Sequence, residues 1–189
     1  MSSPRQIYTY LKNYFDKKNT VKIKNYKALV TTGPTREYLD PVRYISNESS
    51  GKQGCEIAIA LDRLGVKTTL ITGPSNFILP KSIKVKKIIS ADQMLDNVKK
   101  IMPVDLAVCA AAVSDLKPKE RSKAKIKKTD LNFKSINFVK NNDILEYISK
   151  NNKHRPRLVA GFSAETENLI KNSIKKMKDK NCVLIFAND

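Results

Sequence analysis

Two short polar segments early in the chain combine residue types that bind anions. The first, residues 31–36, follows an apolar run and reads TTGPTR. Gly33 permits a close backbone approach, Thr32 and Thr35 supply hydroxyl groups, and Arg36 can pair with an anion. The segment matches neither GxGxxG nor the P-loop pattern GxxxxGKS/T, so it is not one of those two nucleotide fingerprints. Taken alone, it fits a structural turn as well as a ligand site.

The second segment, residues 46–51 (SNESSG), leads directly into a predicted helix. Backbone amides at the start of a helix, together with serine hydroxyls, form a pocket for anions. Helix capping by Ser49 or Ser50 is the alternative interpretation. Capping accounts for one serine but not for Arg43, Asn47 and two adjacent serines together. The pattern therefore favours a phosphate site.

Two further segments later in the chain fit the same chemistry. Residues 110–115 (AAAVSD) end the most apolar run, where small side chains leave room for a flat ligand and Asp115 can accept hydrogen bonds from a sugar or base. A buried strand with a capping aspartate explains the same residues equally well. Residues 125–128 (KIKK) form a basic loop that suits a triphosphate, although a solvated run of charge is the simpler interpretation.

The elements that must position these segments alternate between strands and helices. An open, mostly parallel, Rossmann-like α/β sheet with helices on both faces follows, and its ligands bind beyond the carboxyl ends of the strands. Gly65 is expected to end the second helix. We expect a helix and linker over residues 1–26 and a single domain over 27–189. The predicted strands are 28–32, 66–72, 83–89, 106–113, 158–162 and 183–187, and the predicted helices are 4–16, 52–64, 91–102, 143–150 and 165–178.

Composition narrows the class of partner. The chain has 189 residues, with 36 Lys and Arg against 18 Asp and Glu, which gives a net charge of +18. Such a charge attracts polyanions. However, the lysines are spread along the whole chain with Asn and Ile, and no nucleic-acid-binding motif occurs. We therefore expect an anionic small molecule rather than a specific nucleic acid.

Other residue types exclude further classes. The three cysteines form no CxxC pair or disulfide framework, which indicates a reduced, cytoplasmic protein. The only histidine, His154, lies in a polar stretch and is expected at the surface, so a mechanism that needs two histidines is excluded. No apolar run has the length of a membrane span, and the N-terminus has no secretory signal.

Read in order, the polar segments resemble one family. TTGPTREYLDPVRYISNESSGKQG, AAAVSDLKP, KIKK, NNDIL, GFSAET and the closing AND are similar to the bacterial phosphopantothenate–cysteine ligase, the C-terminal half of a bifunctional decarboxylase/ligase of coenzyme A biosynthesis. The resemblance runs from about Lys27 to Asp189. It implies a ligation of 4′-phosphopantothenate to L-cysteine that uses CTP and Mg²⁺, passes through an acyl-cytidylate and releases pyrophosphate and CMP.

The resemblance also implies roles for individual residues. Asn47, Lys125 and Arg43 match catalytic positions, and Asn47 and Ala112 match positions near phosphopantothenate. Lys176 and Lys180 match by spacing only, so ordinary surface lysines are the alternative for these two. The implied nucleotide-binding set is Gly33, Ser49, Ser50, Gly51, Cys109, Ala110, Ala111, Asp115, Lys125, Asn141, Asp143, Ile144, Phe162, Lys176 and Lys180.

Three departures from the family pattern affect these expectations. Asn142 replaces the proline of NPDIL, which frees a backbone torsion, adds an N–H and predicts a looser loop. Gln53 replaces Met in SGKMG, a mild change. The family continues after AND for roughly 30–40 residues, so the last strand here is expected to have a bare edge. The family also implies a homodimer and a decarboxylase partner, for which a separate chain is one of the open alternatives. An incomplete remnant that binds CTP without completing ligation is the alternative function.

Overall fold

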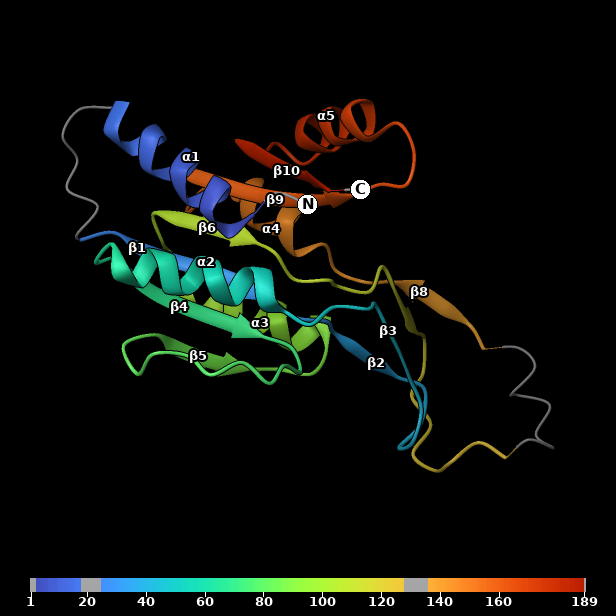
Figure 1. The fold of residues 1–189 in the computed structure, drawn as a ribbon. Coiled ribbons are helices and arrows are strands. Elements are labelled where there is room, and N and C mark those ends of the chain that lie inside the picture. The colour runs from blue at the N-terminus through green and yellow to red at the C-terminus, as the bar shows by residue number, and fades with distance from the viewer. Residues whose placement is uncertain (1–2, 18–24, 128–135, 189) are drawn as a thin grey trace.

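A six-stranded parallel sheet forms the centre of the protein in the computed structural model, which describes residues 3–17, 25–127 and 136–188 (Figure 1). Its strand order is β10-β9-β6-β1-β4-β5. Taken in chain order, the strands on one side of β1 are the second and third, and those on the other side are the fourth to sixth. This is the doubly wound Rossmann order, which confirms the predicted fold class. The strands are β1 (Lys27–Thr32), β4 (Lys67–Thr72), β5 (Lys84–Lys87), β6 (Leu106–Cys109), β9 (Leu158–Ala164) and β10 (Leu184–Asn188).

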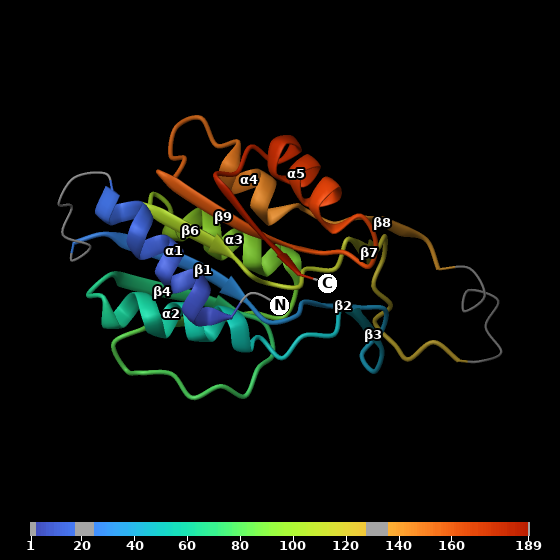
Figure 2. The ribbon, with the colours of Figure 1, turned by 45° about the horizontal axis from the view of Figure 1, so that its top comes forward.

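Helices cover both faces of the sheet, because alternate strand residues are apolar in both directions (Figures 1 and 2). In β1, Ala28 and Val30 join the cluster under α1 and α2, whereas Leu29 joins the cluster under α3, α4 and α5. The helices are α1 (Pro4–Lys17), α2 (Lys52–Arg63), α3 (Ala91–Ile101), α4 (Ile144–Ser149) and α5 (Leu169–Asp179). Among the described residues, no helix is both long and apolar enough to cross a bilayer.

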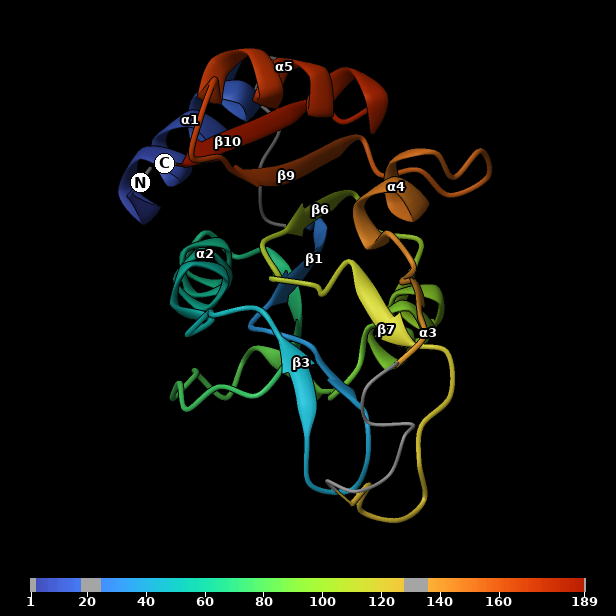
Figure 3. The same ribbon diagram turned by 90° about the vertical axis from the view of Figure 1, so that its right-hand side faces the viewer.

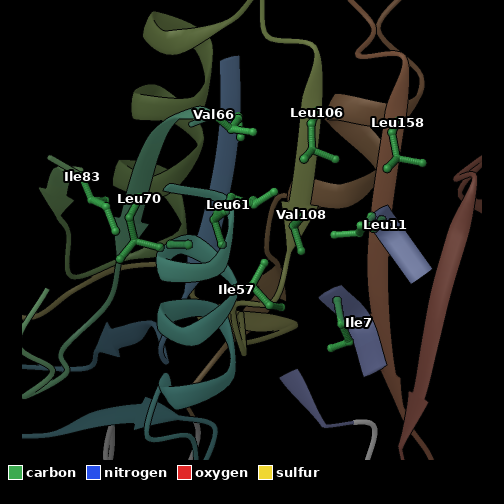
Figure 4. Packing of buried hydrophobic residues seen from close by; sticks show 14 of the residues in the cluster. Ile7, Leu11, Ile57, Leu61, Val66, Leu70, Ile83, Leu106, Val108 and Leu158 are labelled. Carbon is green, nitrogen blue, oxygen red and sulfur yellow. The ribbon is translucent and has the colours of Figure 1, made fainter. Parts of the chain in front are cut away.

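The N-terminal helix α1 is part of the core. Its Ile7 and Leu11 are 0% and 3% exposed and belong to the same cluster as Ile57 and Leu61 of α2 (Figure 4). Burying such a side chain stabilises a fold by about 1.5–3 kcal/mol. The helix predicted over residues 4–16 is therefore confirmed.

Two small antiparallel hairpins lie beyond the carboxyl ends of the parallel strands, to the right in Figure 1. β2 (Arg36–Tyr38) pairs with β3 (Tyr44–Ser46), and β7 (Leu116–Pro118) pairs with β8 (Phe138–Lys140). The rings of Tyr38 and Tyr44 lie 5.3 Å apart. The guanidinium of Arg121 covers Tyr38 at 4.9 Å, so the stack joins the first hairpin to the segment after β7. The strand pattern did not predict these three-residue strands.

Some predicted boundaries are wrong for identifiable reasons. The strand expected over 106–113 ends at Cys109, because residues 110–113 leave the sheet to contact the loop after β1. The last helix begins at Leu169 rather than at 165, since Asn168 has the left-handed torsion φ 51°. Gly65 ends α2 with φ 81°, as predicted. The linker residues 18–24, Lys128 of KIKK and Asp189 of AND lie outside the described residues.

Candidate active site

The first part of the site is the crevice between β1 and β6, where the order of the sheet reverses. Ligands of doubly wound sheets bind at this switch point. The loops that follow the two strands are joined: the Ala112 N–H donates to the Gly33 carbonyl at 3.0 Å, and the Thr35 N–H donates to the Ala112 carbonyl at 3.3 Å. The Thr35 hydroxyl also accepts a hydrogen bond from the Ser114 N–H at 3.0 Å. Two of the predicted segments therefore form one surface.

Asn47 lies on this surface. Its side-chain amide donates to the Val113 carbonyl at 3.0 Å, which ties the loop after β3 to the loop after β6. The preceding Ser46 hydroxyl donates to the Thr35 carbonyl at 2.7 Å. The structure thus brings Asn47 close to Ala112, the two residues that the family resemblance places near phosphopantothenate.

The serine segment borders a hollow of about 420 Å³ at the start of α2. Gly51 begins the helix with φ 74°, and its carbonyl accepts a hydrogen bond from the Thr32 hydroxyl at 2.7 Å. The hydroxyls of Ser49 and Ser50 accept from the N–H groups of Gly51 and Lys52 at 3.2 and 3.3 Å. Gly51 is the N-cap of α2 and makes no side-chain capping hydrogen bond, so the alternative of helix capping by Ser49 or Ser50 is wrong. The serine hydroxyls make local turn contacts beside the open hollow. The hollow is lined by Ser3, Pro4, Thr32, Glu48, Ser49, Ser50, Gly51, Lys52, Gln53, Gly54 and Ala110.

A second, larger cleft of about 640 Å³ lies on the other face of the sheet, under α4 and α5. It collects most of the implied nucleotide-binding residues: Cys109, Ala111, Asp115, Asn141, Asp143, Ile144, Phe162, Lys176 and Lys180. Thr31 and Ser114, which lie in the candidate segments 31–36 and 110–115 but were given no individual role, also line it, as does Glu146, which no motif indicated. The Phe162 ring stacks on Phe186 with centroids 5.1 Å apart.

Lys180, one of the lysines that line this cleft, is paired with carboxylates. The Lys180 ammonium lies 2.9 Å from the Asp143 carboxylate and 2.7 Å from that of Glu146. Its hydrogen bond to Glu146 raises the pKa of Lys180 to about 12, and hydrogen bonds from Lys150 and Lys180 lower the pKa of Glu146 to about 2. Both groups are charged at neutral pH, so an anion in the cleft competes with the carboxylates for Lys180.

The Cys109 thiol in this cleft is not an activated nucleophile. Burial raises its pKa to about 12, and the nearby Asp143 carboxylate contributes to the rise. A thiol reacts as the thiolate, so Cys109 stays protonated and acts as part of the wall.

The loop before α4 is anchored, which corrects the expectation that Asn142 loosens it. The Asn142 side chain donates to the Asp92 carboxylate of α3 at 2.8 Å. Lys117 of β7 holds the other oxygen of Asp92 at 2.5 Å, and the Asn141 side chain donates to the Ser114 carbonyl at 3.0 Å. A side-chain tether thus takes the place of the rigidity that proline would give.

Arg43 and Lys125 lie apart from this cleft. The Arg43 guanidinium bonds to the carboxylate of Asp40 and to the Ile126 carbonyl. Lys125 is exposed and borders a separate hollow of about 550 Å³ between the β2–β3 hairpin and the segment after β7. The structure therefore does not place Lys125 among the residues that line the larger cleft. His154 is exposed, as predicted.

The strand order places the protein in the doubly wound, Rossmann-like α/β class, with the candidate site in the loops beyond the carboxyl ends of the strands (Figure 3). Residues 23–189 match the model of the DNA/pantothenate metabolism flavoprotein C-terminal domain, and the chain belongs to this family. This membership confirms the resemblance that the motifs indicated.

Individual relatives agree. The chain is 40% identical over 190 residues to the coenzyme A biosynthesis bifunctional protein CoaBC of Haemophilus influenzae, a match that includes 100% of this chain and 46% of the relative. It is 41% identical over 179 residues to CoaBC of Borreliella burgdorferi, with 94% of this chain and 45% of the relative covered. The chain spans about half the length of these relatives.

A solved structure shows the same fold. The crystal structure of the C-terminal domain of a coenzyme A biosynthesis bifunctional protein CoaBC superposes with a TM-score of 0.75 at 33% sequence identity. The match covers 87% of this chain and 78% of that chain.

Proposed function

We propose that this chain is a phosphopantothenate–cysteine ligase domain that uses CTP. The observation that carries the proposal is the joining of the loops after β1, β3 and β6 at the switch point, beside a cleft that gathers the implied nucleotide-binding residues. The membership of the family and the similarity to the CoaBC proteins support it.

In the proposed first step, a carboxylate oxygen of 4′-phosphopantothenate attacks the α-phosphorus of CTP. The bond from that phosphorus to the bridging oxygen breaks, pyrophosphate leaves with the electron pair, and an acyl-cytidylate forms. Such a step depends on positioning and charge neutralisation. We assign to the triphosphate Lys176 and Lys180, which line the cleft. We add Lys125, which borders the separate hollow, on the family resemblance alone.

In the proposed second step, the cysteine amine attacks the acyl carbon, the bond to the cytidylate oxygen breaks, and CMP leaves. The amine proton passes to the leaving group or to water, and an amide is formed. We assign the handling of the acyl-cytidylate to Asn47, whose side-chain amide donates to the carbonyl of Val113, the residue after Ala112.

Mg²⁺ fits this site as a companion of the nucleotide. The described residues contain no group of three His, Cys, Asp or Glu side chains arranged to hold a metal. Magnesium on nucleotides commonly takes phosphate oxygens, water and one or two carboxylates. Asp115 is exposed at the cleft and is the carboxylate that we assign to this ion, which would neutralise phosphate charge.

Two partners extend the proposal. We propose that the domain works as a homodimer. We also propose that a decarboxylase, either fused to this domain or on a separate chain, uses the product of the ligation. Size measurement in solution and a coupled assay with a phosphopantothenoylcysteine decarboxylase test these two points directly.

Pyrophosphate release by the purified chain tests the main proposal. The assay contains CTP, Mg²⁺ and 4′-phosphopantothenate, with and without cysteine. The expected result is release that requires phosphopantothenate, with CMP and the cysteine amide formed once cysteine is present. A folded chain that binds CTP but releases no pyrophosphate is the incomplete remnant, and this outcome overturns the ligase proposal.

A further inference from the structure

Asp40 is a buried carboxylate with an unusually full set of hydrogen bonds. Its side chain is 0% exposed, and its Oδ1 accepts from the backbone N–H groups of Val42 and Arg43, both at 2.8 Å. Its Oδ2 accepts from the Arg43 side chain at 2.9 and 2.5 Å and from the Ile126 N–H at 3.2 Å. The Arg43 bond, the largest cause, holds the pKa of Asp40 well below its usual range. A buried charge is tolerated when it is paired in this way.

Asp40 and Arg43 together bind both backbone groups of Ile126, its N–H and its carbonyl. The Ile126 N–H donates to Asp40, and the Ile126 carbonyl accepts from the Arg43 guanidinium at 2.7 Å. These bonds link residues 83 and 86 positions apart in the chain. Because Ile126 follows Lys125 directly, the grip fixes the backbone position of that lysine while its ammonium stays exposed.

Two more contacts hold the same loop to the β2–β3 hairpin. The Ser122 N–H donates to the Leu39 carbonyl at 2.9 Å, and the Arg121 guanidinium covers the Tyr38 ring at 4.9 Å. The segment from 121 to 126 is therefore held at its start and at its end. Lys125 lies between these two sets of contacts.

We propose that Asp40 and Arg43 are positioning residues that act through Lys125, and that Arg43 does not itself contact the substrate. This inference rests on the proposed function for its kinetic part. The charge of Arg43 is matched by Asp40, and its Nε and Nη2 groups donate to Asp40 and to the Ile126 carbonyl. Asp40 and Arg43 hold the backbone next to Lys125 in place, and the Lys125 side chain extends from there to an anion.

The substitution Asp40→Asn tests the grip with little change in shape. All five groups that bond to Asp40 are donors, so a side-chain amide necessarily turns an N–H₂ toward at least one of them. The first readout is limited trypsin digestion, with cleavage after Arg121, Lys123, Lys125 and Lys127 resolved by mass spectrometry. We expect cleavage in this segment to accelerate about 10-fold or more, because a released loop opens locally.

The matched control is Asp105→Asn. The Asp105 carboxylate also accepts a backbone hydrogen bond, from the Lys27 N–H at 2.9 Å, at the opposite end of the sheet. This variant is expected to leave both the 121–127 cleavage rate and pyrophosphate release unchanged. If Asp40→Asn unfolds by circular dichroism, Arg43→Lys replaces it, since lysine keeps the charge but loses the fork that holds Ile126.

The kinetic readout separates positioning from binding. Asp40→Asn is expected to lower kcat for pyrophosphate release about 10-fold or more with a much smaller change in KM for CTP. In the double variant with Lys125→Gln, the loss is expected to stay within about twofold of Lys125→Gln alone, since both act through one group.

The outcomes are distinct for the two proposals. If folded Asp40→Asn is cleaved within residues 121–127 at the wild-type rate, Asp40 does not hold the loop, whatever the activity of the variant. Fully additive losses in the double variant overturn action through Lys125. Absence of pyrophosphate release from the wild-type chain counts against the ligase function, while the digestion comparison still decides whether Asp40 and Arg43 hold the loop.

Discussion

Glu146 accepts an ion-paired hydrogen bond from Lys180 at 2.7 Å, although 34 positions separate the two residues. The contact joins the first turns of α4 to the end of α5 and spans one wall of the larger cleft. It also determines how that wall responds to pH.

We expect Glu146→Gln to lower the melting temperature slightly at neutral pH and less in acid. The pKa of Glu146 is depressed from 4.5 to about 2, so its contribution is present above pH 4.5 and is lost as the pH falls toward 2. Thermal melts across this range, with Asp96→Asn of α3 as the exposed control, measure the difference. A stability difference that stays constant from pH 7 to pH 2 contradicts the assignment.

Asn47→Asp is expected to separate the two chemical steps. The new carboxylate would face the Val113 carbonyl that the Asn47 amide now contacts at 3.0 Å, so two acceptors would repel. Pyrophosphate release should remain within about threefold of wild type, and amide formation should fall about 100-fold, as when a donor is lost from a developing charge. Quenched-flow detection of pyrophosphate and of the cysteine amide measures both steps. Unchanged rates for both steps would show that Asn47 does not handle the acyl-cytidylate.

Thr31→Val and Thr32→Val are expected to have opposite effects on stability. The Thr31 hydroxyl is buried without a hydrogen-bond partner among the described residues and makes only a weak contact with the neighbouring Cys109 thiol. The Thr32 hydroxyl donates to the Gly51 carbonyl at 2.7 Å. Urea unfolding should show no loss, or a gain of about 1 kcal/mol, for Thr31→Val and a loss of about 1 kcal/mol for Thr32→Val. Equal losses would show that Thr31 has a partner.

Gly54→Ala should destabilise the protein even though alanine favours helices. A Cβ at this position of α2 would lie 2.4 Å from the Thr32 Cβ and 2.3 Å from its hydroxyl. The gain in helix propensity is about 1 kcal/mol, whereas overpacking costs about 1–3 kcal/mol. We expect a net loss of about 1–2 kcal/mol in urea unfolding. A net gain would mean that α2 can move off β1 freely.

The helices and the strands of the parallel sheet could be predicted from the sequence, because burial on both faces of that sheet makes their apolar spacing regular. The loops that form the site also followed from the sequence, since they come directly after the strands and carry the family motifs. The contacts between distant side chains could not be predicted from the sequence. Asp40 with Ile126, and Glu146 with Lys180, join segments whose approach depends on the register of the whole sheet.

Asn142 illustrates the limit of local rules. The loss of proline predicts a looser backbone, and this holds for an isolated loop. In the fold, Asp92 of α3 lies within 2.8 Å of the Asn142 side chain and holds it. A contact between residues 50 positions apart thus overrides the local preference.

The strand order has a consequence for how the protein folds. β1 and β6 form the two sides of the crevice, and Thr31 pairs with Cys109 across it. The site is therefore completed only when two distant parts of the chain have met, a contact that is slow to form because of the long loop it closes. A ligand that binds there favours the fully folded chain over every partly folded form. Binding of the proposed nucleotide should then raise the free energy of unfolding, by an amount that grows with nucleotide concentration.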